Sequence, residues 1–107
     1  MGRYKAAFII PINAEKFLDD DGWNFVSPAR LAPEIRNYFI EALNLNLVEQ
    51  YLGIERYLTA NMQMSVIFDD ENQIELINFQ VYDGGLPILL KSWEDGKASF
   101  NVELFIP

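Results

Sequence analysis

The sequence predicts an α+β fold in which an antiparallel sheet packs against one or two helices. Its C-terminal half contains four extended segments separated by turn clusters at regular intervals, which is typical of a β meander. Apolar residues recur at helical spacing around residue 35, and residues 3–12 alternate as a half-buried strand does. We therefore expect a four-stranded antiparallel meander in the C-terminal half, an N-terminal strand, and the helices on one face of the sheet.

The N-terminal strand is predicted over residues 3–12. One face of it carries an apolar or aromatic residue at every position: Tyr4, Ala6, Phe8, Ile10 and Ile12. Pro11 suits a sheet edge or the end of a strand. A basic pair, Arg3 and Lys5, precedes the apolar run as in a signal peptide, but no small-residue cleavage site follows. A strand is the better interpretation.

Residues 13–27 combine polar residues with Phe17, Trp23 and Phe25, and we interpret them as a loop held by aromatic side chains. A helix follows. Its apolar positions have helical spacing and are Leu31, Ile35, Tyr38, Phe39, Ala42 and Leu43. The spacing repeats over residues 47–52 up to Gly53, which indicates a second short helix or a continuation of the first.

The predicted meander comprises residues 62–68, 74–82, 86–93 and 97–106. Its three turns are Asp69-Asp70-Glu71-Asn72, Asp83-Gly84-Gly85 and Glu94-Asp95-Gly96, where Asp and Gly favour tight hairpins. The second segment changes phase, because its apolar residues fall on even positions at first and on odd positions later. A β-bulge near Leu76 would restore one continuous apolar face.

The 107 residues contain no internal repeat, low-complexity tract or linker, so we expect one domain over residues 1–107. Half of the residues are hydrophobic and 14% are aromatic, which is enough apolar material for a core. No uncharged apolar run approaches the length of a bilayer span. These observations favour a cytoplasmic protein without a membrane segment.

The net charge of −8 limits the partners that the chain can attract. Such a charge repels nucleic acids and anionic membranes, whereas it attracts basic proteins at long range. We therefore expect no direct binding to nucleic acids. The alternative is that the acidity only keeps the protein in solution.

The composition also excludes several kinds of catalysis. The chain has no histidine and no cysteine, which removes the commonest general base, thiolate nucleophiles and the usual zinc ligands. The acidic run Asp19-Asp20-Asp21-Gly22 fails as a calcium loop, because Phe17 and Pro28 would fall where oxygen ligands are needed. We expect no enzyme activity, no cofactor and no metal, with a loose cation site at this run left as an alternative.

The acidic turns of a meander should lie together. The first and third turns leave the sheet at the same end, which would place Asp69, Asp70, Glu71, Glu94 and Asp95 along one negative edge. We expect this edge to bind a basic partner, with Trp93 as an aromatic contact. The turn residues Asp19, Asp20 and Asp21 are further candidates for partner binding.

Three functions remain. The leading one is an acidic inhibitor of a basic protein, either an immunity protein that neutralises a nuclease-type toxin or a phage-encoded nucleic-acid mimic. In composition alone, the chain resembles bacterial immunity proteins, which are small, acidic, aromatic-rich and without catalytic residues. The alternatives are a small-molecule or metal-ion binding module and an assembly subunit that pairs through residues 3–12. The sequence does not fix the oligomeric state.

Overall fold

The structure is a computed structural model that describes residues 4–82 and 84–107 of the chain. Eight strands and two α-helices are present in these residues, with one short 3₁₀ helix. In chain order, the elements are β1 (Lys5–Pro11), β2 (Glu15–Asp19), β3 (Gly22–Val26), α1 (Pro33–Ala42), β4 (Asn46–Tyr51), β5 (Ile54–Thr59), β6 (Met62–Phe68), β7 (Ile74–Val81), α2 (Gly85–Gly96), η1 (Lys97–Ser99) and β8 (Val102–Phe105).

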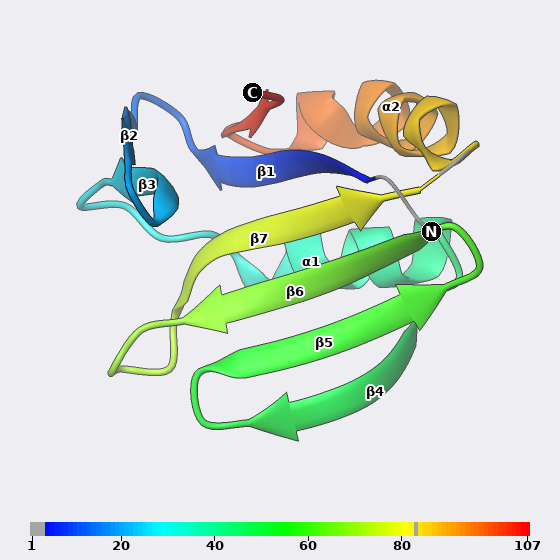
Figure 1. Ribbon diagram of the computed structural model, residues 1–107, viewed down its shortest axis with the longest axis horizontal. Helices are drawn as coiled ribbons and strands as arrows, with labels where there is room; N and C mark the ends of the chain where they lie inside the picture. Colours follow the sequence, from blue (N-terminus) through cyan, green and yellow to red (C-terminus); the bar gives the residue numbers. More distant parts are fainter. Residues whose placement is uncertain (1–3, 83) are drawn as a thin grey trace.

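Six strands form one antiparallel sheet in the order β4-β5-β6-β7-β1-β8. Figure 1 shows the first five of these side by side. Four consecutive strands, β4 to β7, form a meander on one side. The N-terminal strand β1 lies inside the sheet, between β7 and β8. Strands β2 and β3 form a separate hairpin. The sheet therefore has two edges, a longer one at β4 and a short one at β8.

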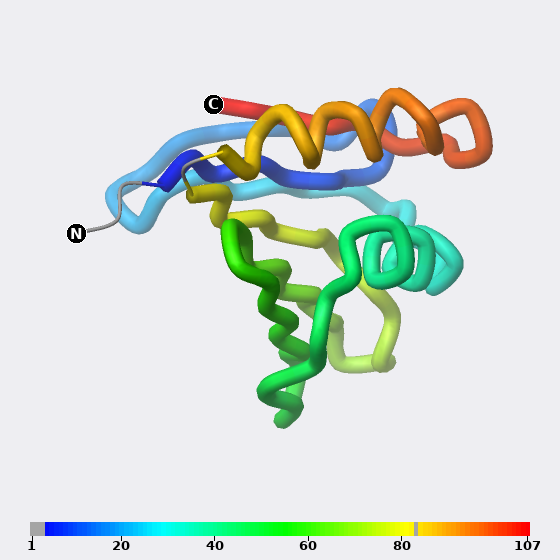
Figure 2. The backbone as a smooth tube through the Cα atoms, turned by 90° about the vertical axis from the view of Figure 1, so that its right-hand side faces the viewer, coloured from blue at the N-terminus to red at the C-terminus, as the bar shows by residue number. Residues whose placement is uncertain are grey.

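Both helices contribute to the main core on one face of the sheet (Figures 1 and 2). From α1, Phe39 stacks edge-on against Phe79 of β7 with 5.3 Å between ring centroids. From α2, Leu89 is fully buried in the same cluster. The Tyr38 hydroxyl of α1 donates a hydrogen bond of 2.6 Å to the carbonyl oxygen of Ser92, which joins the two helices. The helices and the sheet thus share one core.

The opposite face of β1 is covered by the β2–β3 hairpin. Phe8 and Ile10 are buried on this side, in a second cluster with Ala14. Trp23 and Phe25 of the hairpin pack over it, and the Trp23 ring lies 4.9 Å from that of Phe105 in β8. Since Ala7 and Ile9 are buried on the helix side, β1 is covered on both faces.

The predicted α+β class, with an antiparallel sheet and its helices on one face, is confirmed. The N-terminal strand, the first helix and the strands at residues 62–68 and 74–82 are all present. The predicted bulge is present too, because Ile67 pairs with Leu76 while Phe68 pairs with Ile74. The first residue of the predicted N-terminal strand, Arg3, and the turn residue Asp83 lie outside the described residues.

The location of the meander is corrected. Its four strands span residues 46–81, since residues 46–59 form β4 and β5 and the predicted second helix does not exist. The helical prediction assumed that the apolar residues at positions 47, 48, 51 and 52 share a buried face. All four are exposed in the structure, where they belong to the edge strand β4 and to the turn that follows it.

The third predicted strand, residues 86–93, is instead part of helix α2, which begins after a chain reversal at Gly84. Four apolar residues in this segment have the spacing i, i+3, i+4 and i+7 of an amphipathic helix: Leu86, Leu89, Leu90 and Trp93. The regular intervals between turns hid this pattern. The last strand is also shorter than predicted, because residues 97–99 form the 3₁₀ turn η1 before β8.

Two further expectations are wrong. Residues 13–27 are not a loop, because β2 and β3 form a hairpin around the Asp19–Gly22 turn. Residues 3–12 cannot supply a free sheet edge, because β1 already pairs with β7 and β8. Neither helix of the described residues has the length and apolar run that a membrane span requires.

The start of α2 supports a prediction about packing. A Cβ atom at Gly85 would lie 2.5 Å from the backbone oxygen of Asn61 and 2.8 Å from the side chain of Val81. That oxygen accepts a hydrogen bond from the Tyr82 amide, so it cannot move freely. We expect Gly85→Ala to lower the free energy of unfolding by about 1–3 kcal/mol in urea titrations. Glu94→Ala, on the exposed surface of α2, should change it by about 0.5 kcal/mol or less; equal effects would contradict the close packing.

Candidate functional site

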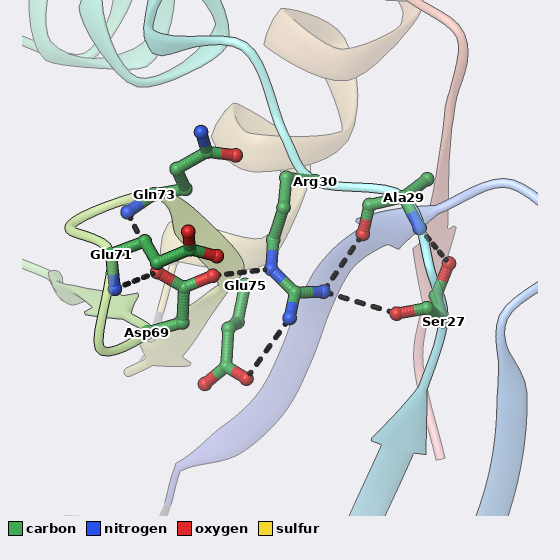
Figure 3. A network of polar contacts seen from close by, with 7 residues as sticks. All are labelled: Ser27, Ala29, Arg30, Asp69, Glu71, Gln73 and Glu75. Atoms are coloured by element: carbon green, nitrogen blue, oxygen red, sulfur yellow. Dashed lines mark hydrogen bonds and ion pairs between the residues drawn. The ribbon is translucent and has the colours of Figure 1, made fainter.

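An arginine lies at the centre of a polar network that links the segment before α1 to the β6–β7 turn (Figure 3). Arg30 is placed there by its neighbour Leu31, whose amide donates a 2.9 Å hydrogen bond to the carbonyl oxygen of Ile74 at the start of β7. The Nη1 atom of Arg30 donates to the carbonyl oxygens of Ser27 and Ala29, each at 3.0 Å. These contacts fix the guanidinium against its own chain segment.

The Asp69 carboxylate accepts three hydrogen bonds. Arg30 Nε donates to Oδ2 at 2.8 Å, and the amides of Glu71 and Gln73 donate to Oδ1 at 2.8 and 2.9 Å. The arginine contact, followed by the Gln73 amide, lowers the pKa of Asp69 below its ordinary value. Asp69 is therefore the residue that shapes the β6–β7 turn, and its charge is balanced within the chain.

The β-bulge brings a fourth acid to this place. Glu75 is the extra residue between the pairs formed by Ile74 and Leu76, and its carboxylate lies 3.8 Å from Nη2 of Arg30. A bulge commonly redirects a side chain in this way. Asp69, Asp70, Glu71 and Glu75, with Arg30 among them, form a surface that we call the acidic turn; Arg30 offsets only part of its charge.

Three depressions meet at Arg30. The acidic turn and Phe68 line one of about 370 Å³. A larger groove of about 520 Å³ runs between the start of α1 and the β6–β7 turn, with Leu31, Phe68 and Ile74 among its lining residues. A third, of about 250 Å³, lies between the β2–β3 hairpin and Glu75. Most of the acidic turn is thus exposed, and it lies beside a larger groove whose lining includes apolar side chains.

Ion pairing distributes the charge unevenly over the molecule. Of the seven basic side chains in the described residues, six form ion pairs within the chain and Lys5 forms none. Eight acids of the same residues form none: Glu15, Asp19, Asp20, Asp21, Glu34, Glu41, Asp70 and Glu71. The excess charge is therefore carried by acids at the surface.

The five acids of the predicted edge do not come together as expected. Asp69, Asp70 and Glu71 form the β6–β7 turn, but Glu94 and Asp95 belong to the last turn of α2. The end of α2 and the β6–β7 turn are separate in both views of the backbone (Figures 1 and 2). Glu94 pairs with Lys97 at 2.9 Å and Asp95 with Lys91 at 3.5 Å.

The remaining predicted site residues lie elsewhere. Trp93 is half-buried on α2, where it packs against the main core. Asp19, Asp20 and Asp21 form the exposed tip of the β2–β3 hairpin. Asp19 is used to build this turn, since its carboxylate accepts hydrogen bonds from the Asp21 amide at 2.9 Å and the Asn24 side chain at 2.7 Å.

The β4–β5 hairpin has ion pairs of its own. Glu49 pairs with Arg56 across the two strands, and Glu55 pairs with Arg36 of α1 at 3.2 Å. Tyr57 also donates a hydrogen bond to Glu55. Burial, followed by this hydrogen bond, raises the pKa of Tyr57 to about 12. Every charge on this hairpin is thereby balanced.

The residues in the described part of the chain contain no cluster of three or more acids arranged to hold a metal ion. Comparison with protein-family models, with curated proteins and with solved structures finds no match. A functional interpretation therefore depends on the chemistry of the surfaces described above.

Sequence reasoning missed two residues of the acidic turn, Arg30 and Glu75. Arg30 gave no signal, because it lies in a connection and meets Asp69 only through the Leu31–Ile74 pairing. Glu75 did carry a signal. It is the polar residue directly before Leu76, near which the bulge is predicted, so the predicted bulge could have indicated it.

The lowered pKa of Asp69 predicts how stability changes in acid. A group whose pKa is depressed by folding stabilises the folded state above its unfolded pKa of about 3.9, and this contribution is lost as the pH falls through the folded pKa. We expect Asp69→Asn to flatten the loss of stability below about pH 4 in urea unfolding. Asp70→Asn, at an exposed acid without an ion pair in the described chain, should retain the wild-type slope. An unchanged slope in Asp69→Asn would contradict this role.

Proposed function

We propose that the chain is an acidic inhibitor that binds a basic protein, of the kind that an immunity protein against a nuclease-type toxin or a phage-encoded nucleic-acid mimic represents. One observation carries the proposal. Six of the seven described basic side chains are balanced internally, while eight acids are left to face solvent. A basic partner would be attracted at long range by this excess of negative charge, which accelerates association.

The acidic turn is the part of this field best suited to specific contact. Arg30 and two backbone amides hold the Asp69 carboxylate and so restrain the turn, on which the neighbouring Asp70 and Glu71 are exposed. A rigid turn loses little conformational entropy on binding. The adjacent Phe68 offers an apolar surface on which the stem of a lysine or arginine of the partner could rest.

The shifted pKa values in the described residues have structural causes. The pKa values of Arg30 and Asp69 are shifted mainly by the hydrogen bond between them, and the pKa of Tyr57 is raised by burial and then by its hydrogen bond to Glu55. We propose that the chain acts by binding, without catalysis, in the cytoplasm.

Charge reversal tests where the partner binds. We expect the pair Asp70→Lys and Glu71→Lys to weaken binding by tenfold or more, about 1.4 kcal/mol, because both carboxylates would contact the basic surface. The matched control is Glu15→Lys with Glu41→Lys, which changes the net charge equally at exposed acids on β2 and α1. The partner would be recovered from the native host by the tagged full chain, identified, and titrated against each variant by calorimetry.

Salt dependence completes this test. Binding of the wild-type chain should weaken steeply as the ionic strength rises, since the Debye length shortens from about 10 Å at 0.1 M to 3 Å at 1 M. Equal loss of affinity in both double variants would show that the partner responds to the total charge of the molecule and that the acidic turn is not a specific contact site. Tight binding that is indifferent to salt would overturn the charge-driven inhibitor.

One observation favours a second candidate, a small-molecule binding module. The groove of about 520 Å³ between α1 and the β6–β7 turn combines apolar lining residues such as Phe68 with polar ones, which include Arg30 and Arg36. Pockets of this size and chemistry hold small ligands. A thermal-shift screen separates the two functions, because a ligand that binds the folded state raises its melting temperature. Stabilisation by a small acid would favour this candidate, and it should be lost in Phe68→Ala.

A further inference from the structure

The edge strand β4 is the second surface of the molecule that lacks an explanation. It is the outermost strand of the meander, so the backbone groups on its outer side have no partner strand within the described chain. Proteins normally protect such an edge with proline, charged side chains, a β-bulge or a covering segment. Of these, β4 has a bulge at Val48, between the pairs of Leu47 and Glu49, and one charged residue, Glu49. The sequence of β4, Asn-Leu-Val-Glu-Gln-Tyr, contains neither proline nor lysine.

Apolar side chains accompany this open edge. Leu47, Val48 and Tyr51 are each about half exposed, and Leu52, in the turn that follows, is 97% exposed. Leu58 of the adjacent strand is exposed as well. A strand edge with free backbone groups and exposed apolar residues is complementary to another β-strand.

Charge indicates which strand would bind here. The molecule carries a net charge of −8, but Glu49 and Glu55 of the β4–β5 hairpin are both paired with arginines of the same chain. This hairpin is therefore locally neutral. It offers nothing to the basic partner proposed above, whereas it is a place where two equally acidic molecules can approach without direct repulsion, because more distant charges are screened.

The residues of β4 also fit antiparallel pairing with themselves. A two-fold axis through Gln50 places Gln50 opposite Gln50 of a second copy and Glu49 opposite Tyr51 of that copy. The two members of each pair lie on the same face of the joined sheet. Val48 then lies near Leu52 of the second copy. No carboxylate faces another carboxylate in this register, the two Gln50 amides can bond to each other, and the aliphatic side chains of Val48 and Leu52 come together.

We propose that the chain forms a two-fold symmetric homodimer in which β4 pairs with β4 of a second copy and joins the two six-stranded sheets into one. The proposal does not depend on the inhibitor function, since the acidic turn lies between β6 and β7 and is not part of this edge.

Sedimentation velocity on the full chain tests the dimer. Between about 1 µM and 500 µM at physiological salt, the wild-type chain should shift from monomer to dimer. Amide hydrogen exchange of residues 46–51 should slow over the same range, which identifies the edge that becomes covered. A monomer at every concentration would overturn the proposal.

The deciding variant is Val48→Lys. Val48 is the extra residue of a bulge between the pairs of Leu47 and Glu49, so its replacement leaves the pairing with β5 intact. We expect the dimer dissociation constant to rise by about tenfold or more. The added lysine makes the net charge less negative, so weaker association cannot be attributed to greater repulsion.

Ile88→Lys is the matched control. Ile88 is 46% exposed on α2 and Val48 is 53% exposed, so the two changes are equal in charge and similar in exposure. The control should dimerise as the wild type does. If Val48→Lys fails to fold, Leu52→Lys in the exposed turn replaces it. A dimer that is weakened equally by Ile88→Lys, or is indifferent to both edge variants, would overturn the β4 interface.

Discussion

Burial of β1 on both faces is the constraint on which the rest of this fold depends. A strand with Ala7 and Ile9 on one side and Phe8 and Ile10 on the other must be covered twice. The helices cover one side and the β2–β3 hairpin the other. The hairpin immediately follows β1 in the chain and lies on the face opposite to the helices. The segment from the end of β3 to the start of α1 therefore has to cross to the other face of the sheet, and it does so past the start of β7.

That return path creates the acidic turn. The passing segment pairs at Leu31 with Ile74, and this single bridge brings Arg30 to the turn at the end of β6. Asp69 and the bulge residue Glu75 then gather around one guanidinium. Core packing thus determines which acids are neutralised, and it leaves Asp70 and Glu71 outside the network.

The sequence predicted those parts of the fold in which apolar spacing and burial coincide. In α1, β6 and β7 the apolar residues are the buried ones, so the elements and even the bulge were predicted correctly. In β4 the apolar residues are exposed, and their spacing misled the prediction. The prediction for the residues of α2 was wrong for another reason. Evenly spaced turns suggested strands, although Leu86, Leu89 and Trp93 follow a helical period.

The site was harder to predict, since its geometry depends on contacts between distant segments. Three of the five acids of the expected edge share a turn because they are adjacent in sequence. The other two, Glu94 and Asp95, were placed at the edge because residues 86–93 were predicted to be a strand, whereas they belong to helix α2. Arg30 meets Asp69 across 39 residues of chain, which no local pattern reveals.

The distribution of charge relates the two proposed surfaces to each other. An excess of unpaired acids makes most of the molecule unsuitable for contact with a second copy, yet it is the property that would attract a basic protein. At the β4–β5 hairpin, Arg36 and Arg56 remove that excess locally. Repulsion between two copies would then disfavour other orientations and leave the β4 edge as the place where they can meet. The same arginines that stabilise the hairpin would in this way also select the geometry of the dimer.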